Sequence, residues 1–235
     1  QPKFVPNEAV EVVLRDAATA RVRLVDCVGY LIPGVLGLNE GEEARMVRTP
    51  WFDHDIPFEE AAEIGTRRVI CEHATIGVVV TTDGSIVDMP RSAYTEAEER
   101  VIRELKALGK PFIIVLNCKD PASPDVQRLR DALSEKHGVP VHAVDVMGMQ
   151  LDGVNELLES VLFEFPIREI RIHAPSWLTS LSEDHWLGKS VGDSVASAAE
   201  AIHRVRDHEK LRAALAGNEY TEEVLPGEIN LNDGT

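Results

Sequence analysis

The sequence predicts an α/β fold in which a parallel β-sheet is covered by helices on both faces. Short apolar runs typical of buried strands alternate with helical patterns between residues 76 and 165. Glycine, proline and aspartate separate the runs, and the alternation stops at Pro166. Because strands and helices in rotation favour right-handed crossovers, the sheet formed by these runs should be parallel.

The chain begins with a predicted antiparallel hairpin at the edge of that sheet. Apolar residues alternate over residues 10–14 and again over 22–26, and residues 15–18 suit the turn between them. A loop with Gly, Pro and acidic residues follows, and residues 58–73 have a helical pattern.

Strands and helices then alternate as far as residue 165. The predicted strands are 76–81, 112–117 and 139–144, and the predicted helices are 92–108, 124–136 and 153–165. Gly109 and Gly138 stand where the second and third of the chain's predicted helices should end.

The pattern changes at Pro166, which we take as the boundary between domains 1–165 and 166–235. Residues 167–173 fit a further strand, and a long helix is predicted over 191–216. That helix would carry an apolar seam on one face, made of Val191, Val195, Ala198, Ile202 and Val205. The second domain should therefore be the start of a smaller α+β unit.

Composition narrows the functional classes. The 235 residues include 24 Lys and Arg against 40 Asp and Glu, a net charge of -16, which disfavours nucleic acid as a partner. No apolar run is long enough to span a bilayer, so we expect a cytoplasmic protein. Three cysteines without a C-x-x-C pair favour neither a disulfide framework nor structural zinc.

Asp26 and Gly29 form the most informative motif for function. In P-loop NTPases, an acid at the end of a buried strand orients the magnesium shell, and a glycine three residues later lets a backbone amide approach the terminal phosphate. A strand that ends in Asp before a Gly turn also arises for purely structural reasons. The position of a second motif favours the functional interpretation.

This second motif follows the predicted strand 112–117, about ninety residues after Asp26. Asn117 and Asp120 have the spacing of the base-reading loop N-K-x-D of guanine-binding proteins. Cys118 occupies the second position, however, and Lys119 comes one residue late. Two roles are therefore open for Asn117 and Asp120: contact with a nucleotide base, and capping of the next helix.

The phosphate-binding loop G-x-x-x-x-G-K-[ST] does not occur in the chain. Gly188-Lys189-Ser190 resembles its end, but Glu183 stands where the first glycine would be needed. We expect Lys189 to be a solvated residue. Without this loop, the chain alone should not hydrolyse a nucleotide.

Several longer stretches carry a more specific signal, namely residues 2–7, 23–30, 49–51, 56–67, 97–102, 175–177 and 185–187. Together these stretches closely resemble the stage IV sporulation protein A family of endospore-forming bacteria. The resemblance implies a P-loop NTPase domain that is similar to translation-factor GTPases but uses ATP, followed by a middle domain and a C-terminal region. By this resemblance the phosphate-binding loop would precede Gln1, and the C-terminal region would follow Thr235.

The resemblance also implies site residues and partners. Asp26 would hold Mg²⁺ through water, and Gly29 would lie at the terminal phosphate. Asn117, Lys119 and Asp120 are the candidate base-contacting residues from their position and spacing, but an ATP-using family has no need of a guanine-reading aspartate, so Asp120 is either incidental or a mark of relaxed base choice. ATP hydrolysis would drive self-assembly into a homopolymer, the basement layer of the spore coat. This layer would lie in the mother-cell cytoplasm at the outer forespore surface, with a small amphipathic membrane-bound sporulation protein and other coat morphogenetic proteins as partners. Membrane contact would then be indirect.

Two other functions remain open. The chain could be a non-catalytic assembly protein on a degenerate NTPase fold, or a guanine-nucleotide switch that depends on Asn117 and Asp120. In each case the loop that carries Trp51 and Phe52 is a candidate for a nucleotide-dependent contact. Internal packing of Trp51 is an equally good interpretation.

Overall fold

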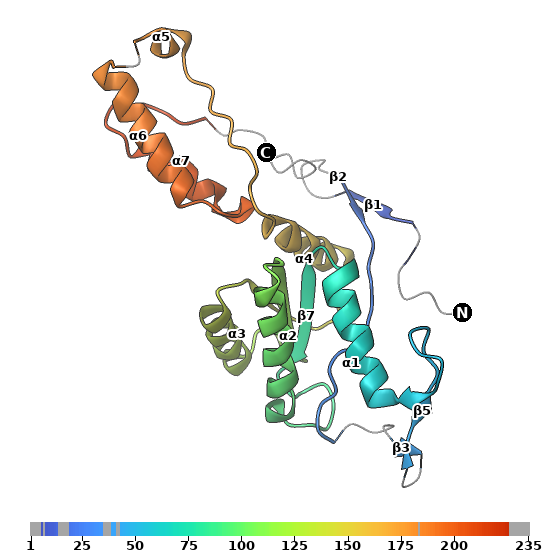
Figure 1. Ribbon diagram of the computed structural model, residues 1–235. Coiled ribbons are helices and arrows are strands. Elements are labelled where there is room, and N and C mark those ends of the chain that lie inside the picture. The colour runs from blue at the N-terminus through green and yellow to red at the C-terminus, as the bar shows by residue number, and fades with distance from the viewer. Residues whose placement is uncertain are drawn as a thin grey trace. The chain divides into compact units, whose positions relative to one another are not determined.

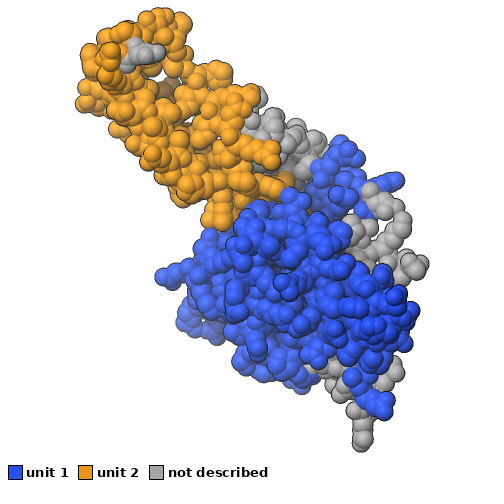
Figure 2. All heavy atoms as spheres, in the orientation of Figure 1, with its two compact units in different colours: residues 1–12, 21–157 blue, residues 13–20, 158–235 orange. Residues whose placement is uncertain are grey.

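The computed structural model describes residues 6, 8–13, 19–34, 39–40, 43–182 and 184–225. These residues fall into two compact units, shown in Figure 2. The first unit comprises residues 1–12 and 21–157, and the second comprises residues 13–20 and 158–235.

A three-stranded parallel sheet lies at the centre of the first unit. Its strands are β7 (Gly77–Thr82), β8 (Phe112–Asn117) and β9 (Val141–Val144), in the order β7-β8-β9. Ile114 is in register with Val79 on one side and with Val141 on the other. All five apolar side chains of residues 112–116 are buried, as expected of a central strand with both faces covered. The predicted parallel α/β sheet is confirmed.

Helices follow the strands in the predicted rotation (Figure 1). They are α1 (Phe58–Arg68), continued by a π-helical turn (Val69–His73), then α2 (Thr95–Ala107), α3 (Pro124–His137) and α4 (Leu151–Phe163). Ile102 and Leu105 of α2 and Leu133 of α3 belong to the main apolar core together with Leu116 of β8. Gly138 ends α3 with φ 69°, a left-handed conformation that favours glycine.

The predicted N-terminal hairpin forms a sheet of its own. Strands β1 (Val10–Val13) and β2 (Thr19–Val22) pair with each other, and the turn predicted at residues 15–18 lies outside the described residues. Among the described strands, β7 pairs only with β8, and its Val78 and Val80 are exposed.

The loop that precedes α1 contains two small antiparallel sheets. Strand β3 (Asn39–Glu40) pairs with β4 (Glu43–Ala44), and β5 (Met46–Val47) pairs with β6 (Ile56–Pro57). A side chain added at Gly65 of α1 would meet the Trp51 ring at 3.2 Å, and the Arg68 guanidinium lies 5.3 Å from the centre of that ring. The half-buried Trp51 therefore packs against α1.

The second unit differs from the sequence-based expectation. Its helices are α5 (Ser176–Thr179), α6 (Trp186–Glu200) and α7 (His208–Ala216), with a 3₁₀ turn at Val205–Asp207. The long helix predicted over 191–216 is interrupted, and residues 167–173 form no strand. The only bridge in this described region pairs Pro166 with Arg204.

The interruption has a local cause. The Asp207 carboxylate accepts hydrogen bonds from the backbone amides of His203 and Arg204, at 3.4 and 3.2 Å. These bonds replace helical ones, since a side-chain acceptor competes with the backbone for the amides. The predicted apolar seam is therefore divided: Ala198 is buried on α6, whereas Ile202 and Val205 are buried in and after the break.

Candidate functional site

The segment that leads to Asp26 is not the buried strand predicted from the sequence. Strand β2 ends at Val22, and residues 23–30 form no strand in the structure. Leu24 is 76% exposed, and Asp26 is exposed too. An alternating apolar pattern makes a buried strand only where a neighbouring strand accepts its backbone hydrogen bonds, and the described strands offer none here.

Gly29 has the backbone conformation that the motif requires. Its φ is 83°, which side-chain-bearing residues rarely adopt. A Cβ atom added there would meet nothing within 4 Å. The turn is thus open to solvent, so that a bound group can approach the Gly29 backbone.

The residues predicted to contact a base lie at the carboxyl end of β8. Asn117 accepts a hydrogen bond from the Val146 amide at 3.2 Å, and the Lys119 amide donates to the Ser85 hydroxyl at 3.1 Å. Loops after three parallel strands, namely 83–85, 117–120 and 145–146, therefore meet at one edge of the sheet. Ligands of open α/β sheets bind at this edge.

The side chains of this edge differ in what they can offer a ligand. Cys118 is fully buried, and burial together with the nearby Asp83 carboxylate raises the pKa of its thiol, which therefore stays neutral. Lys119 and Asp120 are exposed, although one Asp120 oxygen already accepts the Ala122 amide at 3.2 Å. Lys119 is thus free to lie over a planar ring, while Cys118 anchors the loop.

Sequence reasoning missed the part played by Ser85 and Val146. Ser85 is held by the Asp83 carboxylate, which accepts from its amide at 2.9 Å and from its hydroxyl at 2.6 Å. The available signal was positional, since both residues follow strands that were predicted correctly. Among the described residues, no hydrogen bond or ion pair joins Asp26 to these loops.

Lys189 behaves as the sequence predicted. It lies on α6, is exposed, and pairs with Asp184 at 2.9 Å. The described element directly before α6 is the helix α5 and not a strand, so Lys189 cannot serve as the lysine of a phosphate-binding loop.

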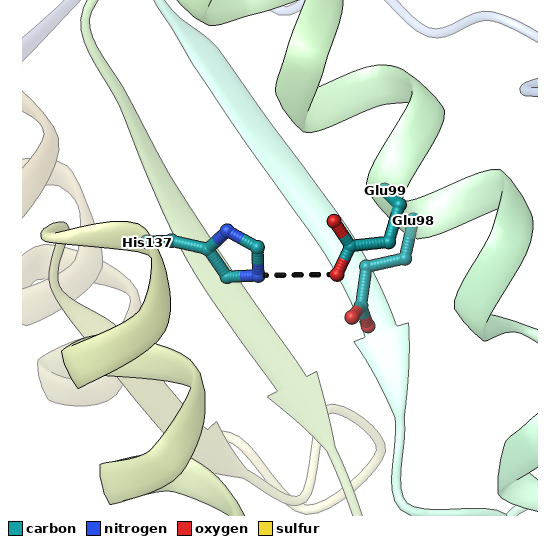
Figure 3. A group of neighbouring side chains, drawn as sticks. All are labelled: Glu98, Glu99 and His137. Carbon is teal, nitrogen blue, oxygen red and sulfur yellow. Dashed lines mark ion pairs between the residues drawn. The ribbon is translucent and has the colours of Figure 1, made fainter.

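A second polar group, not predicted from the sequence, joins α2 to α3 (Figure 3). Glu98, Glu99 and His137 bring one ligand atom each within 4.8 Å of one another. Arg91 lies 2.6 Å from Glu98, however, and Lys136 pairs with Glu99. Two cations already balance the two carboxylates, so we interpret the group as a structural ion-pair cluster rather than a metal site.

Two family profiles match the chain, one after the other. The profile of the stage IV sporulation protein A ATPase domain matches residues 1–166, and that of its middle domain matches residues 167–235. The chain is 47% identical to stage IV sporulation protein A of Bacillus subtilis (strain 168), 44% to that of Bacillus anthracis and 43% to that of Clostridioides difficile (strain 630). Each match covers the whole chain and 48% of the relative, so the chain spans about half the length of these proteins.

No solved structure matches the chain significantly. In the parts of the chain that the structure describes, no helix has the length and apolar character needed to cross a membrane.

Proposed function

This chain belongs to the stage IV sporulation protein A family, and from that premise we propose that it supplies part of the nucleotide site of an ATP-hydrolysing sporulation scaffold. The family gives the chain an ATPase domain with a P-loop NTPase fold and a sporulation role. One structural observation carries the rest of the proposal: three loops meet at the carboxyl edge of the parallel sheet, where such folds bind ligands.

The surroundings of each predicted residue allow the role that we propose for it. Asp26 is an exposed carboxylate, which suits a Mg²⁺ ion held through water. The open turn at Gly29 lets its amide reach the terminal phosphate. Lys119 and Asp120 contact the base, and Asn117 holds the loop that carries them. Bound Mg²⁺ would supply charge stabilisation for transfer of the terminal phosphoryl group.

At the level of the cell, we propose that hydrolysis drives assembly of further copies of the protein into the basement layer of the spore coat. The proposed partners are a small amphipathic membrane-bound sporulation protein at the forespore surface and other coat morphogenetic proteins. The net charge of -16 supports protein partners over nucleic acid.

The test uses the gene product that contains this chain. Asp26→Ala should lower ATP turnover by about tenfold or more, because the magnesium shell loses its carboxylate. Asp131→Ala, at an exposed aspartate on α3 of the same unit, is the matched control and should retain normal turnover. Equal rates for Asp26→Ala and the unsubstituted protein would remove Asp26 from the mechanism. Absence of ATP turnover in the unsubstituted protein would favour the non-catalytic assembly protein.

The spacing of Asn117 and Asp120 favours one alternative, a guanine-nucleotide switch. Competition between GTP and ATP separates the two functions. If GTP displaces ATP at a lower concentration than unlabelled ATP does, the site reads guanine.

A further inference from the structure

We infer that Tyr30 is a positioning residue that fixes the Asp26–Gly29 turn to helices α1 and α2. This inference rests on the proposed function, because it concerns the turn that would carry magnesium and the terminal phosphate. Tyr30 directly follows Gly29, and it is the first buried residue after β2.

The Tyr30 hydroxyl is committed to α2. It donates a hydrogen bond to the Glu104 carboxylate, and its ring belongs to the main core with 8% of the residue exposed. Burial, together with that hydrogen bond, raises the pKa of Tyr30. The hydroxyl therefore remains a protonated donor, and its hydrogen goes to Glu104.

Arg100 extends the attachment to α1. Its guanidinium lies 3.9 Å from the centre of the Tyr30 ring, within the range of a cation–π contact. The same group donates to Glu63 of α1 and lies 3.6 Å from Glu104. One guanidinium thus holds the aromatic ring and both helices together.

The turn itself has few other attachments among the described residues. Residues 23–29 form no strand, Leu24 and Val28 are exposed, and Gly29 has open space beside it. The position of the Gly29 amide consequently depends on Tyr30. A displacement of the turn, for instance when a terminal phosphate is lost, must either break the bond from Tyr30 to Glu104 or pull on α2.

The experiment removes the hydroxyl while keeping the ring. In the gene product that contains this chain, Tyr30→Phe should lower kcat for ATP about tenfold and leave KM within about twofold, because misplacement of the turn affects the reacting phosphate more than the bound base. Tyr220→Phe is the matched control: its hydroxyl also bonds a carboxylate, Glu219, but it lies in the second unit.

A double-mutant cycle tests the specific partner. Glu104→Leu should cause a loss similar to that of Tyr30→Phe, and the combined variant should lose little more than either one, since both remove the same bond. Independent, multiplicative losses would overturn the pairing. If Tyr30→Phe has a normal kcat while Asp26→Ala is inactive, this inference is overturned and the proposed function stands.

Discussion

The side-chain oxygen of Asn117 accepts a hydrogen bond from the Val146 backbone amide at 3.2 Å. This bond joins the end of β8 to the loop after β9, two segments that are far apart in the sequence. An interaction of this kind makes a binding edge out of separate loops, and it can be removed by a single substitution.

Asn117→Ala should weaken nucleotide binding and lower stability. Loss of the acceptor leaves the Val146 amide without its partner, at a cost of about 1 kcal/mol in the free energy of unfolding. Nucleotide affinity should fall about tenfold as the loop loosens. Fluorescent-nucleotide titration and urea unfolding measure the two effects, with Asn155→Ala on α4 as the control. Unchanged affinity would show that the loop is held by its other contacts.

Asp120→Ala should distinguish the two nucleotides. One Asp120 oxygen accepts the Ala122 amide, and the side chain is exposed, so the substitution should cost little stability. Adenine offers such an aspartate only its amino group, whereas guanine offers two N–H donors, so loss of the Asp120 contact should lower ATP affinity by only about twofold. Any GTP binding should weaken far more. Titration with each nucleotide measures both, and a large loss of ATP affinity would contradict an ATP site of this geometry.

The sequence allowed prediction of the parts of the fold that depend on local patterns. The β8 run is apolar throughout, and Gly109 and Gly138 both adopt positive φ at the ends of helices. The wrong predictions concerned segments whose structure depends on residues that are distant in the sequence. The pattern at Leu24 was that of a strand, but a strand also needs a neighbour. The helical period near Ile202 gave no sign that the Asp207 carboxylate would take the helix amides.

The candidate site was predictable to the same extent. Asn117, Lys119 and Asp120 could be proposed from the sequence because their spacing lies within a single loop. Ser85 and Val146 were not, because they reach that loop through hydrogen bonds between separate strand ends. Tyr30 was visible in the sequence, yet its role depends on Glu104 and Arg100, which only the folded chain brings to it.

Lys110→Met should destabilise the first unit. The Lys110 ammonium donates to the carbonyls of Ile70, Cys71 and Ala74 at 2.5, 3.0 and 2.6 Å, where the helix after α1 ends. Removing a charged donor from terminal helix carbonyls should cost about 2 kcal/mol. Urea unfolding measures this, and Lys106→Met, at an exposed lysine of α2, is the control. A loss equal to that of the control would contradict a capping role.

Arg206→Met should destabilise the second unit by roughly 3 kcal/mol. Glu164 is fully buried at the end of α4 and is paired with Arg204 and with Arg206, the latter at 2.9 Å. Removing one cation leaves a buried carboxylate with less compensation. Arg171→Met, in the exposed pair with Glu169, is the control and should cost less than about 1 kcal/mol. If both variants lose a similar amount of unfolding free energy, solvent screens the ion pairs of Glu164.

Lowering the pH should destabilise the first unit, because the His137 imidazole then takes up a proton. Burial lowers the pKa of this imidazole, and Lys106 and Lys136 lower it further against the opposing effect of Glu99. Its Nε2 has no hydrogen-bond partner among the residues that the structure describes, and it lies 3.7 Å from Glu99. Below about pH 6.5 the unfolded chain takes up a proton at this residue before the folded chain does, so stability falls as pH falls towards the folded-state pKa.

His137→Gln removes the group that binds this proton. The free energy of unfolding should therefore depend less on pH in the variant. The decrease in the free energy of unfolding between about pH 7.5 and pH 5.5 should be smaller in the variant, because a glutamine cannot bind the proton that favours the unfolded chain. Urea unfolding at both pH values measures the difference, and His73→Gln, at an exposed histidine of the same unit, is the control. A steeper pH dependence in His137→Gln would mean that the cationic imidazole pairs with Glu99 in the folded chain, so that attraction to the carboxylate outweighs burial.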